Sequence, residues 1–175
     1  MKIEILVAAH KEFPMPKKEG YLPVLVGAVK NYKPGISYQR DDDGENISSK
    51  NPNYNELTAV YWAWKNLKDV DAIGLVHYRR LFFEKRPYSL DNVISIDKVN
   101  QLLQKYDVIL PKKRNYYIET NYSHYIHAHY KEPLDEARKI IAEVYPNYLP
   151  AFDKVMKKRG AHMFNMFIMK RNAFE

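Results

Sequence analysis

The alternation of apolar and polar positions predicts short buried strands separated by helices. Apolar runs rich in β-branched residues, a pattern typical of strands, cover residues 2–9, 72–77, 107–111 and 163–170. Residues 21–29 are also apolar, but their pattern does not distinguish a strand from a helix. We therefore expect a sheet whose strands come from both ends and the middle of the chain.

One helix is predicted directly after a long polar loop at residues 31–53. Asn53 can cap this helix, and Glu56 follows three residues later, as in a capping box. The large apolar residues that follow share one helical face, and Trp62 lies off it. The members of that face are Leu57, Val60, Tyr61, Trp64 and Leu67. We expect the face to pack against the sheet.

Three more helices are predicted at residues 97–106, 133–144 and 150–159, and Gly160 is expected to end the last of them. In the first of these helices the inward residues are expected to be Val99, Leu102, Leu103 and Tyr106. Residues 112–131 form a second long segment, rich in polar and aromatic residues.

The order of these elements predicts the fold class. A strand, a helix and a strand within residues 72–111 form a crossover unit with parallel strands. The whole pattern predicts an α/β three-layer sandwich with a mostly parallel central sheet, in a single domain spanning residues 1–175. Ligands of such sheets bind beyond the carboxyl ends of the strands. His10, the turn at 77–80 and the loop after Pro111 all follow predicted strands.

Charge and composition narrow the classes of ligand. The net charge of +7 and the pI near 9.3 favour an anionic ligand, a nucleic acid or an anionic membrane surface. The chain has no cysteine, which excludes disulfide frameworks and thiolate metal sites. Glu4 interrupts the first apolar run, which indicates a strand and not a signal peptide, and no run approaches the ~18 residues of a membrane span.

The segment His77-Tyr78-Arg79-Arg80 is the sharpest chemical signal, because two guanidinium groups follow a buried strand directly. Arginine presents a planar fork that matches phosphate oxygens, so the pair could neutralise a diphosphate. The structural alternative is that one arginine pairs with an acidic neighbour and the other faces water.

Three further groups leave alternatives open. Residues 41–46 contain three aspartates without the ligand spacing of a calcium loop, which leaves a divalent-metal site or a solvated loop. His124, His127 and His129 cannot easily converge on a metal from one regular element, so hydrogen bonding to a polar ligand is favoured. Asn165, close to His162, is unusual inside a strand and either bonds neighbouring backbone or faces a site.

Five separated blocks, in order along nearly the whole chain, carry a family resemblance. They are ILVAAHKEFPMP, DDDGENISSKNPNYNELTAVYWAWKN, IGLVHYRRLF, ILPKKRNYYIETNYSHYIHAHY and AHMFNMFIMKRNAF. Together they resemble the bacterial capsular and exopolysaccharide biosynthesis glycosyltransferases, a family long described as a domain of unknown function. The resemblance implies a GT-A-like, Rossmann-like fold. Members of that family continue past the last strand, so we expect a chain ending at Glu175 to be a truncated form.

The resemblance implies transfer of a hexose from a nucleotide sugar, with a UDP-sugar expected, to a growing capsular, exopolysaccharide or O-antigen glycan. A lipid-linked acceptor, a cytoplasmic location and peripheral association with the inner face of the cell membrane follow from that role. The competing functions are a basic nucleic-acid-binding domain, for which no groove-binding motif is present, and a histidine-metal hydrolase.

The resemblance also implies a metal-independent reaction. GT-A enzymes usually end the strand equivalent to residues 73–76 with an Asp-x-Asp motif that holds Mn²⁺ or Mg²⁺, and here His77 and the residues after it take that place. Cationic side chains can stabilise charge on a leaving phosphate as the metal does. We therefore expect no cofactor, with Mn²⁺ or Mg²⁺ at the aspartates of residues 41–43 as the alternative.

The site residues expected from this resemblance fall into three groups. Arg79, Arg80 and His162 are the catalytic candidates. The donor-binding candidates are His10, Asp41, Asp42, Asn46, Lys50, Asn51, His77 and Tyr78. The acceptor-binding candidates are Tyr122, His124, His127, His129 and Asn165.

Overall fold

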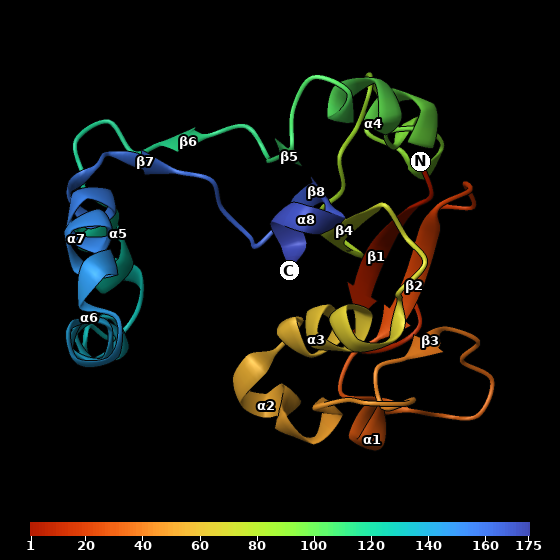
Figure 1. Cartoon of the computed structure of the whole chain (residues 1–175), viewed down its shortest axis with the longest axis horizontal. Helices are drawn as coiled ribbons and strands as arrows, with labels where there is room; N and C mark the ends of the chain where they lie inside the picture. Colours follow the sequence, from red (N-terminus) through yellow and green to blue (C-terminus); the bar gives the residue numbers. More distant parts are fainter. The chain divides into compact units, whose positions relative to one another are not determined.

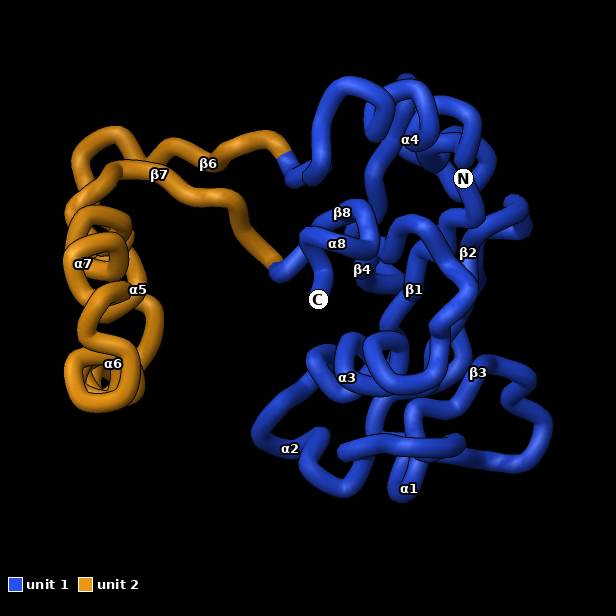
Figure 2. Tube along the Cα trace, in the orientation of Figure 1, with its two compact units in different colours: residues 1–111, 165–175 blue, residues 112–164 orange.

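The computed structural model describes residues 1–175, and its chain forms two units (Figures 1 and 2). The first unit contains residues 1–111 and 165–175, and the second contains residues 112–164. The chain thus leaves the first unit, builds the second as one continuous insertion, and returns to the first. None of the helices has both the length and the apolar content needed to cross a membrane.

A six-stranded sheet in the order β3-β2-β1-β4-β8-β5 forms the centre of the first unit. Its strands are β1 (Ile3–Ala9), β2 (Tyr21–Leu25), β3 (Gln39–Arg40), β4 (Ala72–His77), β5 (Val108–Ile109) and β8 (Phe167–Lys170). Parallel pairing joins β1 to β2 and β4, and β2 to β3, whereas β8 runs antiparallel to both β4 and β5. The predicted α/β class with a mostly parallel sheet is confirmed, with β8 as the reversed strand.

The strand predictions are largely confirmed, with one corrected boundary. The ambiguous segment 21–29 contains β2, because its apolar residues pair in parallel with β1. The last strand begins at Phe167 and not at residue 163. Phe164 and Asn165 have φ angles of 77° and 51°, in the left-handed region, and this conformation interrupts an extended strand. Asn165 therefore belongs to a turn before β8.

The sheet is covered on both faces, which explains why its central strands are apolar at almost every position, with Glu4 of β1 as the exception within the strand. Ile5 and Val7 of β1 pack in a cluster with Val99 and Leu103 of helix α4 (Ile96–Leu103). The intervening residue Leu6 packs on the other face, in a cluster with the helix α3 (Leu57–Asn66). Ser95 caps α4 by accepting a hydrogen bond from the Lys98 backbone N–H.

The expected face of the helix after residue 53 is confirmed for Val60 and Leu67, which pack against the core, and is wrong for Leu57 and Trp64. A short helix α2 (Asn51–Tyr54) contains Asn53, and Glu56 lies at the N-cap of α3 without a side-chain capping bond. The buried residues of α3 are Thr58, Ala59, Trp62 and Ala63. Leu57 and Trp64 are 43% and 38% exposed, whereas Trp62 is 4% exposed. Small residues let the helix approach the sheet closely, and they set the inward face in place of the larger side chains.

The second unit consists of a short two-stranded sheet and three helices. Strand β6 (Arg114–Asn115) pairs antiparallel with β7 (Gly160–Ala161). The helices are α5 (Asn121–Ala128), α6 (Glu132–Val144) and α7 (Leu149–Lys157). Helix α7 ends at Lys157, so Gly160 is a strand residue and not the expected helix stop.

The remaining elements are short and lie mostly in the loops. They are α1 (Ala28–Asn31), α8 (Arg171–Phe174) and the 3₁₀ turns Ser48–Lys50, Leu90–Asn92 and Pro146–Tyr148. Tyr106 lies beyond the end of α4 and is exposed, contrary to its expected inward position.

A buried carboxylate organises the loops around α1. Asp41 has no exposed surface and accepts hydrogen bonds from the backbone N–H groups of Gly27 and Ala28, at 2.8 and 2.9 Å. The hydroxyls of Ser48 and Thr58 donate to the same carboxylate. A buried charge is tolerated only when such donors replace its water. Asp41 thereby ties the end of β3 to α1, to the polar loop and to helix α3.

Replacing Asp41 with alanine should lower the free energy of unfolding by about 3 kcal/mol, because four donors lose their charged acceptor. Asp43→Ala is the matched control. Asp43 is exposed and accepts one bond from the Gln39 side chain, so its removal should change stability by less than about 0.5 kcal/mol. Urea denaturation of both variants measures the difference, and equal losses would contradict the structural role of Asp41.

Candidate functional site

A polar hollow lies where β1 and β4 end, and we call it the switch-point pocket. It has a volume of about 250 Å³. It is lined by Ala8, Ala9, His10, Val26, Asn51, Asn55, Glu56, His77 and Tyr78. From β1, the sheet extends through β2 and β3 on one side and through β4, β8 and β5 on the other. The strand order therefore changes direction at β1, and open α/β sheets bind their ligands beside such a point.

Aromatic rings form one wall of the switch-point pocket. Phe13 and Tyr78 stack with ring centroids 3.6 Å apart and planes 16° apart. The His10 ring lies edge-on to both, with its centroid 5.7 Å from each. The Tyr78 backbone N–H donates to the Ala8 carbonyl at 3.2 Å, which fixes the turn after β4 against β1. The structure therefore brings His10 and Tyr78 together, as expected from their places at two strand ends.

Amides and a carboxylate also line the switch-point pocket. The Asn51 Nδ2 donates to the Asn55 carbonyl at 2.7 Å and to the Thr58 hydroxyl at 3.2 Å. The Glu56 Oε1 accepts from the Asn165 Nδ2 at 2.9 Å. Asn165 was expected on the acceptor side, and the structure places it against a lining residue of the switch-point pocket.

Two lining residues, Asn55 and Glu56, were missed from the sequence. Glu56 was interpreted as part of a capping box, because its spacing from Asn53 fits that motif. Asn55 has a φ of 49°, which separates α2 from α3. The asparagine-rich run around it was the available signal, since asparagine tolerates this conformation.

The two arginines follow the pocket wall in a tight turn. The His77 N–H donates to the Arg80 carbonyl at 3.0 Å, and the Arg80 N–H donates back at 2.9 Å. Tyr78 and Arg79 form the tip of this turn, and both arginine side chains are exposed. The Arg79 guanidinium carbon lies 4.9 Å from the Tyr78 ring centroid, so the charge is held beside the aromatic wall.

Glu84 and Asp43 are two acids that could pair with these arginines, and both form other hydrogen bonds. Glu84 accepts from the Ser95 hydroxyl and from the Ser95 backbone N–H, and these hydrogen bonds lower the pKa of Glu84. Asp43 accepts from the Gln39 amide at 3.0 Å.

The polar loop contributes less to the pocket lining than expected. Asp41 is buried among its own donors, and Asp42 forms a salt bridge with Arg40 at 2.6 Å. The Asn46 amide donates to the Asp42 and Gly44 carbonyls and so braces the loop. Lys50 is exposed, and it immediately precedes the lining residue Asn51. From the donor candidates, the structure brings His10, Asn51, His77 and Tyr78 into one pocket.

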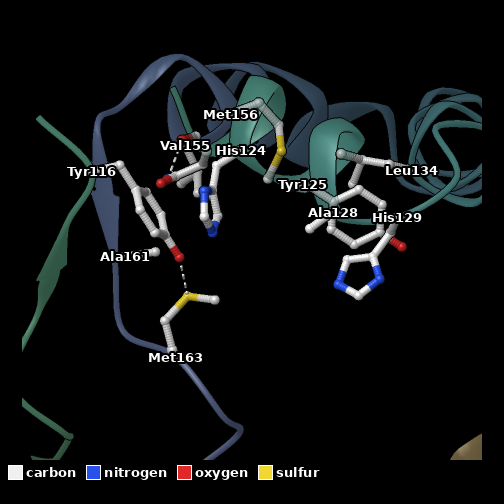
Figure 3. Close-up of a pocket in the computed structure, with 11 residues that line it drawn as sticks. Tyr116, His124, Tyr125, Ala128, His129, Leu134, Val155, Met156, Ala161 and Met163 are labelled. Atoms are coloured by element: carbon white, nitrogen blue, oxygen red, sulfur yellow. Dashed lines mark hydrogen bonds between the residues drawn. The ribbon is translucent and has the colours of Figure 1, made fainter. Parts of the chain in front are cut away.

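A second hollow, which we call the helical pocket, lies within the second unit (Figure 3). His124 and His129 line it together with mostly apolar side chains, among them Leu134, Met156 and Met163. The Tyr116 ring stacks on His124 with centroids 3.8 Å apart, and its hydroxyl donates to the Met163 sulfur at 3.2 Å.

The other acceptor candidates of this unit do not line the helical pocket. Tyr122 lines a separate hollow and donates to Asp135 at 2.8 Å. His127 and His162 are exposed.

A shared carboxylate explains the spacing of two histidines. The Nδ1 atoms of His124 and His127 both contact the Glu119 carboxylate, at 3.1 Å for His124. These hydrogen bonds, from His124 first, lower the pKa of Glu119. No group of three or more His, Asp or Glu side chains in residues 1–175 is arranged to hold a metal ion.

Comparison with solved structures gives a close match to a glycosyltransferase. The chain superposes on the apo structure of the bifunctional glycosyltransferase WbbM with a TM-score of 0.87 and 28% sequence identity. The match covers 99% of this chain and 35% of WbbM, so the chain spans about a third of that protein. No curated protein sequence matches the chain.

The family comparison covers almost the whole chain. The family described as "Domain of unknown function (DUF4422)" matches residues 4–175. The matched residues include both units described above, and the protein belongs to the DUF4422 family.

Proposed function

We propose that this chain is a glycosyltransferase domain that binds a nucleotide-sugar donor in the switch-point pocket. The observation that carries the proposal is the polar pocket at the ends of β1 and β4, in a chain that superposes on a glycosyltransferase over 99% of its length. His10 and Tyr78 offer ring faces and edges for the base, and Asn51 and Asn55 offer amides for sugar hydroxyls. A UDP-sugar is the proposed donor.

The proposed charge partners of the donor diphosphate are Arg79 and Arg80. A diphosphate bound at the switch-point pocket gains negative charge as the sugar leaves, and guanidinium groups beside the pocket stabilise that charge. Two backbone hydrogen bonds close the turn between His77 and Arg80, so the backbone that bears the arginines has a fixed conformation. On this basis the transfer needs no divalent metal.

The proposed general base is Glu56, whose carboxylate lines the pocket and is oriented by Asn165. An acceptor hydroxyl attacks the anomeric carbon, and the bond from that carbon to the diphosphate oxygen breaks with its electrons. The hydroxyl proton passes to the Glu56 carboxylate. Asn165 fixes one carboxylate oxygen and leaves the other for the acceptor.

The proposed acceptor is a growing surface glycan of the capsular, exopolysaccharide or O-antigen type. The helical pocket, with His124 and His129 among apolar side chains, offers rings for stacking on sugar faces. His162 remains a candidate on the acceptor side.

Replacing His10 with alanine should weaken UDP binding about tenfold, because the aromatic wall loses the ring that lies edge-on to Phe13 and Tyr78. Isothermal titration calorimetry with UDP measures the change. His127→Ala, in the second unit, is the matched control and should bind UDP as the parent does. Equal affinity of the His10 variant and the parent would place the donor elsewhere.

Replacing Arg79 or Arg80 with alanine should lower turnover by about 10²–10³, while the melting temperature stays close to that of the parent. Lysine should restore turnover only in part, since it lacks the bidentate fork. Arg86→Ala is the control, because Arg86 is an exposed arginine of another loop and contacts the Tyr88 ring. Activity that vanishes with EDTA and returns with Mn²⁺ would show that the arginines do not replace a metal.

Replacing Glu56 with glutamine should lower turnover by about a hundredfold or more and leave UDP affinity unchanged, because the amide keeps its shape but accepts no proton. Glu45→Gln removes an exposed carboxylate bound to Lys65 and Tyr61, and it should leave turnover unchanged. A Glu56 variant with parental turnover would assign the base to another residue.

A further inference from the structure

The most exposed large apolar side chain of the protein lies in the turn between β6 and α5. Ile118 is 86% exposed, and its neighbour Tyr117 is 76% exposed. We call these two residues the apolar tip. Folding leaves both side chains in solvent, where they are free to contact a partner.

Hydrogen bonds hold the apolar tip in one conformation. The Tyr117 N–H donates to the Asn115 side chain at 2.9 Å, and the Ile118 N–H donates to the Tyr116 carbonyl at 2.7 Å. The Arg159 guanidinium donates to the Tyr117 carbonyl at 3.3 Å. Tyr117 has a φ of 57°, an uncommon conformation for a bulky residue that these bonds maintain. The backbone of the turn is therefore fixed, and both side chains extend from it into solvent.

Five cationic side chains flank the apolar tip, and we call them the basic collar. They are Lys112, Lys113, Arg114, Lys158 and Arg159, all of them exposed. Backbone bonds keep the two segments of the collar together, because the Tyr116 N–H donates to the Arg159 carbonyl and the Asn121 N–H to the Lys158 carbonyl. Lys113, Lys158 and Arg159 also line a common hollow, which is wide enough for an anionic headgroup.

One acid adjoins the apolar tip in the sequence. Glu119 follows Ile118 directly, and its single negative charge is outnumbered by the five cations of the collar. The collar therefore presents net positive charge around an apolar centre.

We propose that the apolar tip and the basic collar form a docking surface for an anionic phospholipid membrane. The isoleucine enters the boundary of the acyl chains, the tyrosine lies at the level of the headgroups, and the collar binds lipid phosphates. A nucleic acid explains the collar but gives the aliphatic tip no apolar partner. A stable protein interface buries about 800 Å² on each partner, far more than two side chains provide. This docking surface does not depend on the reaction proposed above.

Co-sedimentation of the full chain with vesicles tests the proposal. Vesicles of equal parts phosphatidylglycerol and phosphatidylcholine should bind the protein, and vesicles of phosphatidylcholine alone should bind it far more weakly. High salt should release the bound protein, because the collar acts through charge. Equal binding to both vesicle types, or binding to neither, would overturn the proposal.

Two variants separate the contributions of charge and of the apolar tip. Replacing Lys113 and Lys158 together with glutamine should weaken vesicle binding about thirtyfold, and Ile118→Ser should weaken it about tenfold. The matched controls are Lys30→Gln with Lys33→Gln in the first unit, and Ile140→Ser on α6. Circular dichroism verifies that each variant is folded.

The controls also decide between partners. Parental binding by both tip and collar variants, or equal losses in the controls, would overturn the proposal. A collar variant that loses binding to single-stranded DNA but keeps vesicle binding would assign the surface to nucleic acid instead. Should the double lysine variant fail to fold, Lys112→Gln with Lys113→Gln removes two charges from a segment outside any helix or strand.

Discussion

The pairing of β1 with β4 is the constraint on which the rest of the first unit depends. The two strands pair in parallel over six registered positions, from Ile3 opposite Ala72 to Ala8 opposite His77. Helices α3 and α4 cover opposite faces of this pair, so the strands are apolar apart from the half-buried Glu4 until they reach the end of the sheet. Both strands end at the same edge. His10 and His77 meet at the switch-point pocket for this reason.

A chain of hydrogen bonds connects the buried carboxylate to the amides that line that pocket. The Asp41 carboxylate accepts from Thr58, and the Thr58 hydroxyl accepts from Asn51, whose amide also holds the Asn55 carbonyl. Asp41 therefore acts on the pocket through its neighbours and not by contact. An aspartate in a polar loop can serve a site by fixing the residues that line it.

The second unit combines two chemical environments in a small insertion. Tyr116 takes part in both, because its ring stacks on His124 in the helical pocket while its backbone leads into the apolar tip. Glu119 contacts the Nδ1 atoms of His124 and His127 and so ties helix α5 to the turn that precedes it. The β6–β7 pairing closes the unit and sets both segments of the basic collar side by side.

The sequence by itself determined the sheet and the edge where a ligand would bind. Strands buried on both faces are mostly apolar, so β1 and β4 were visible as apolar runs, interrupted in β1 by Glu4 alone, and the polar residues after them marked their carboxyl ends. Only the tertiary structure decided which face of α3 is buried, because close packing favoured Ala59 and Ala63 over the larger residues of the expected stripe. It also decided the meeting of Glu56 with Asn165, which lie 109 residues apart. Sequence patterns within one element predict its periodicity and its caps. Contacts between distant residues depend on how the whole chain packs.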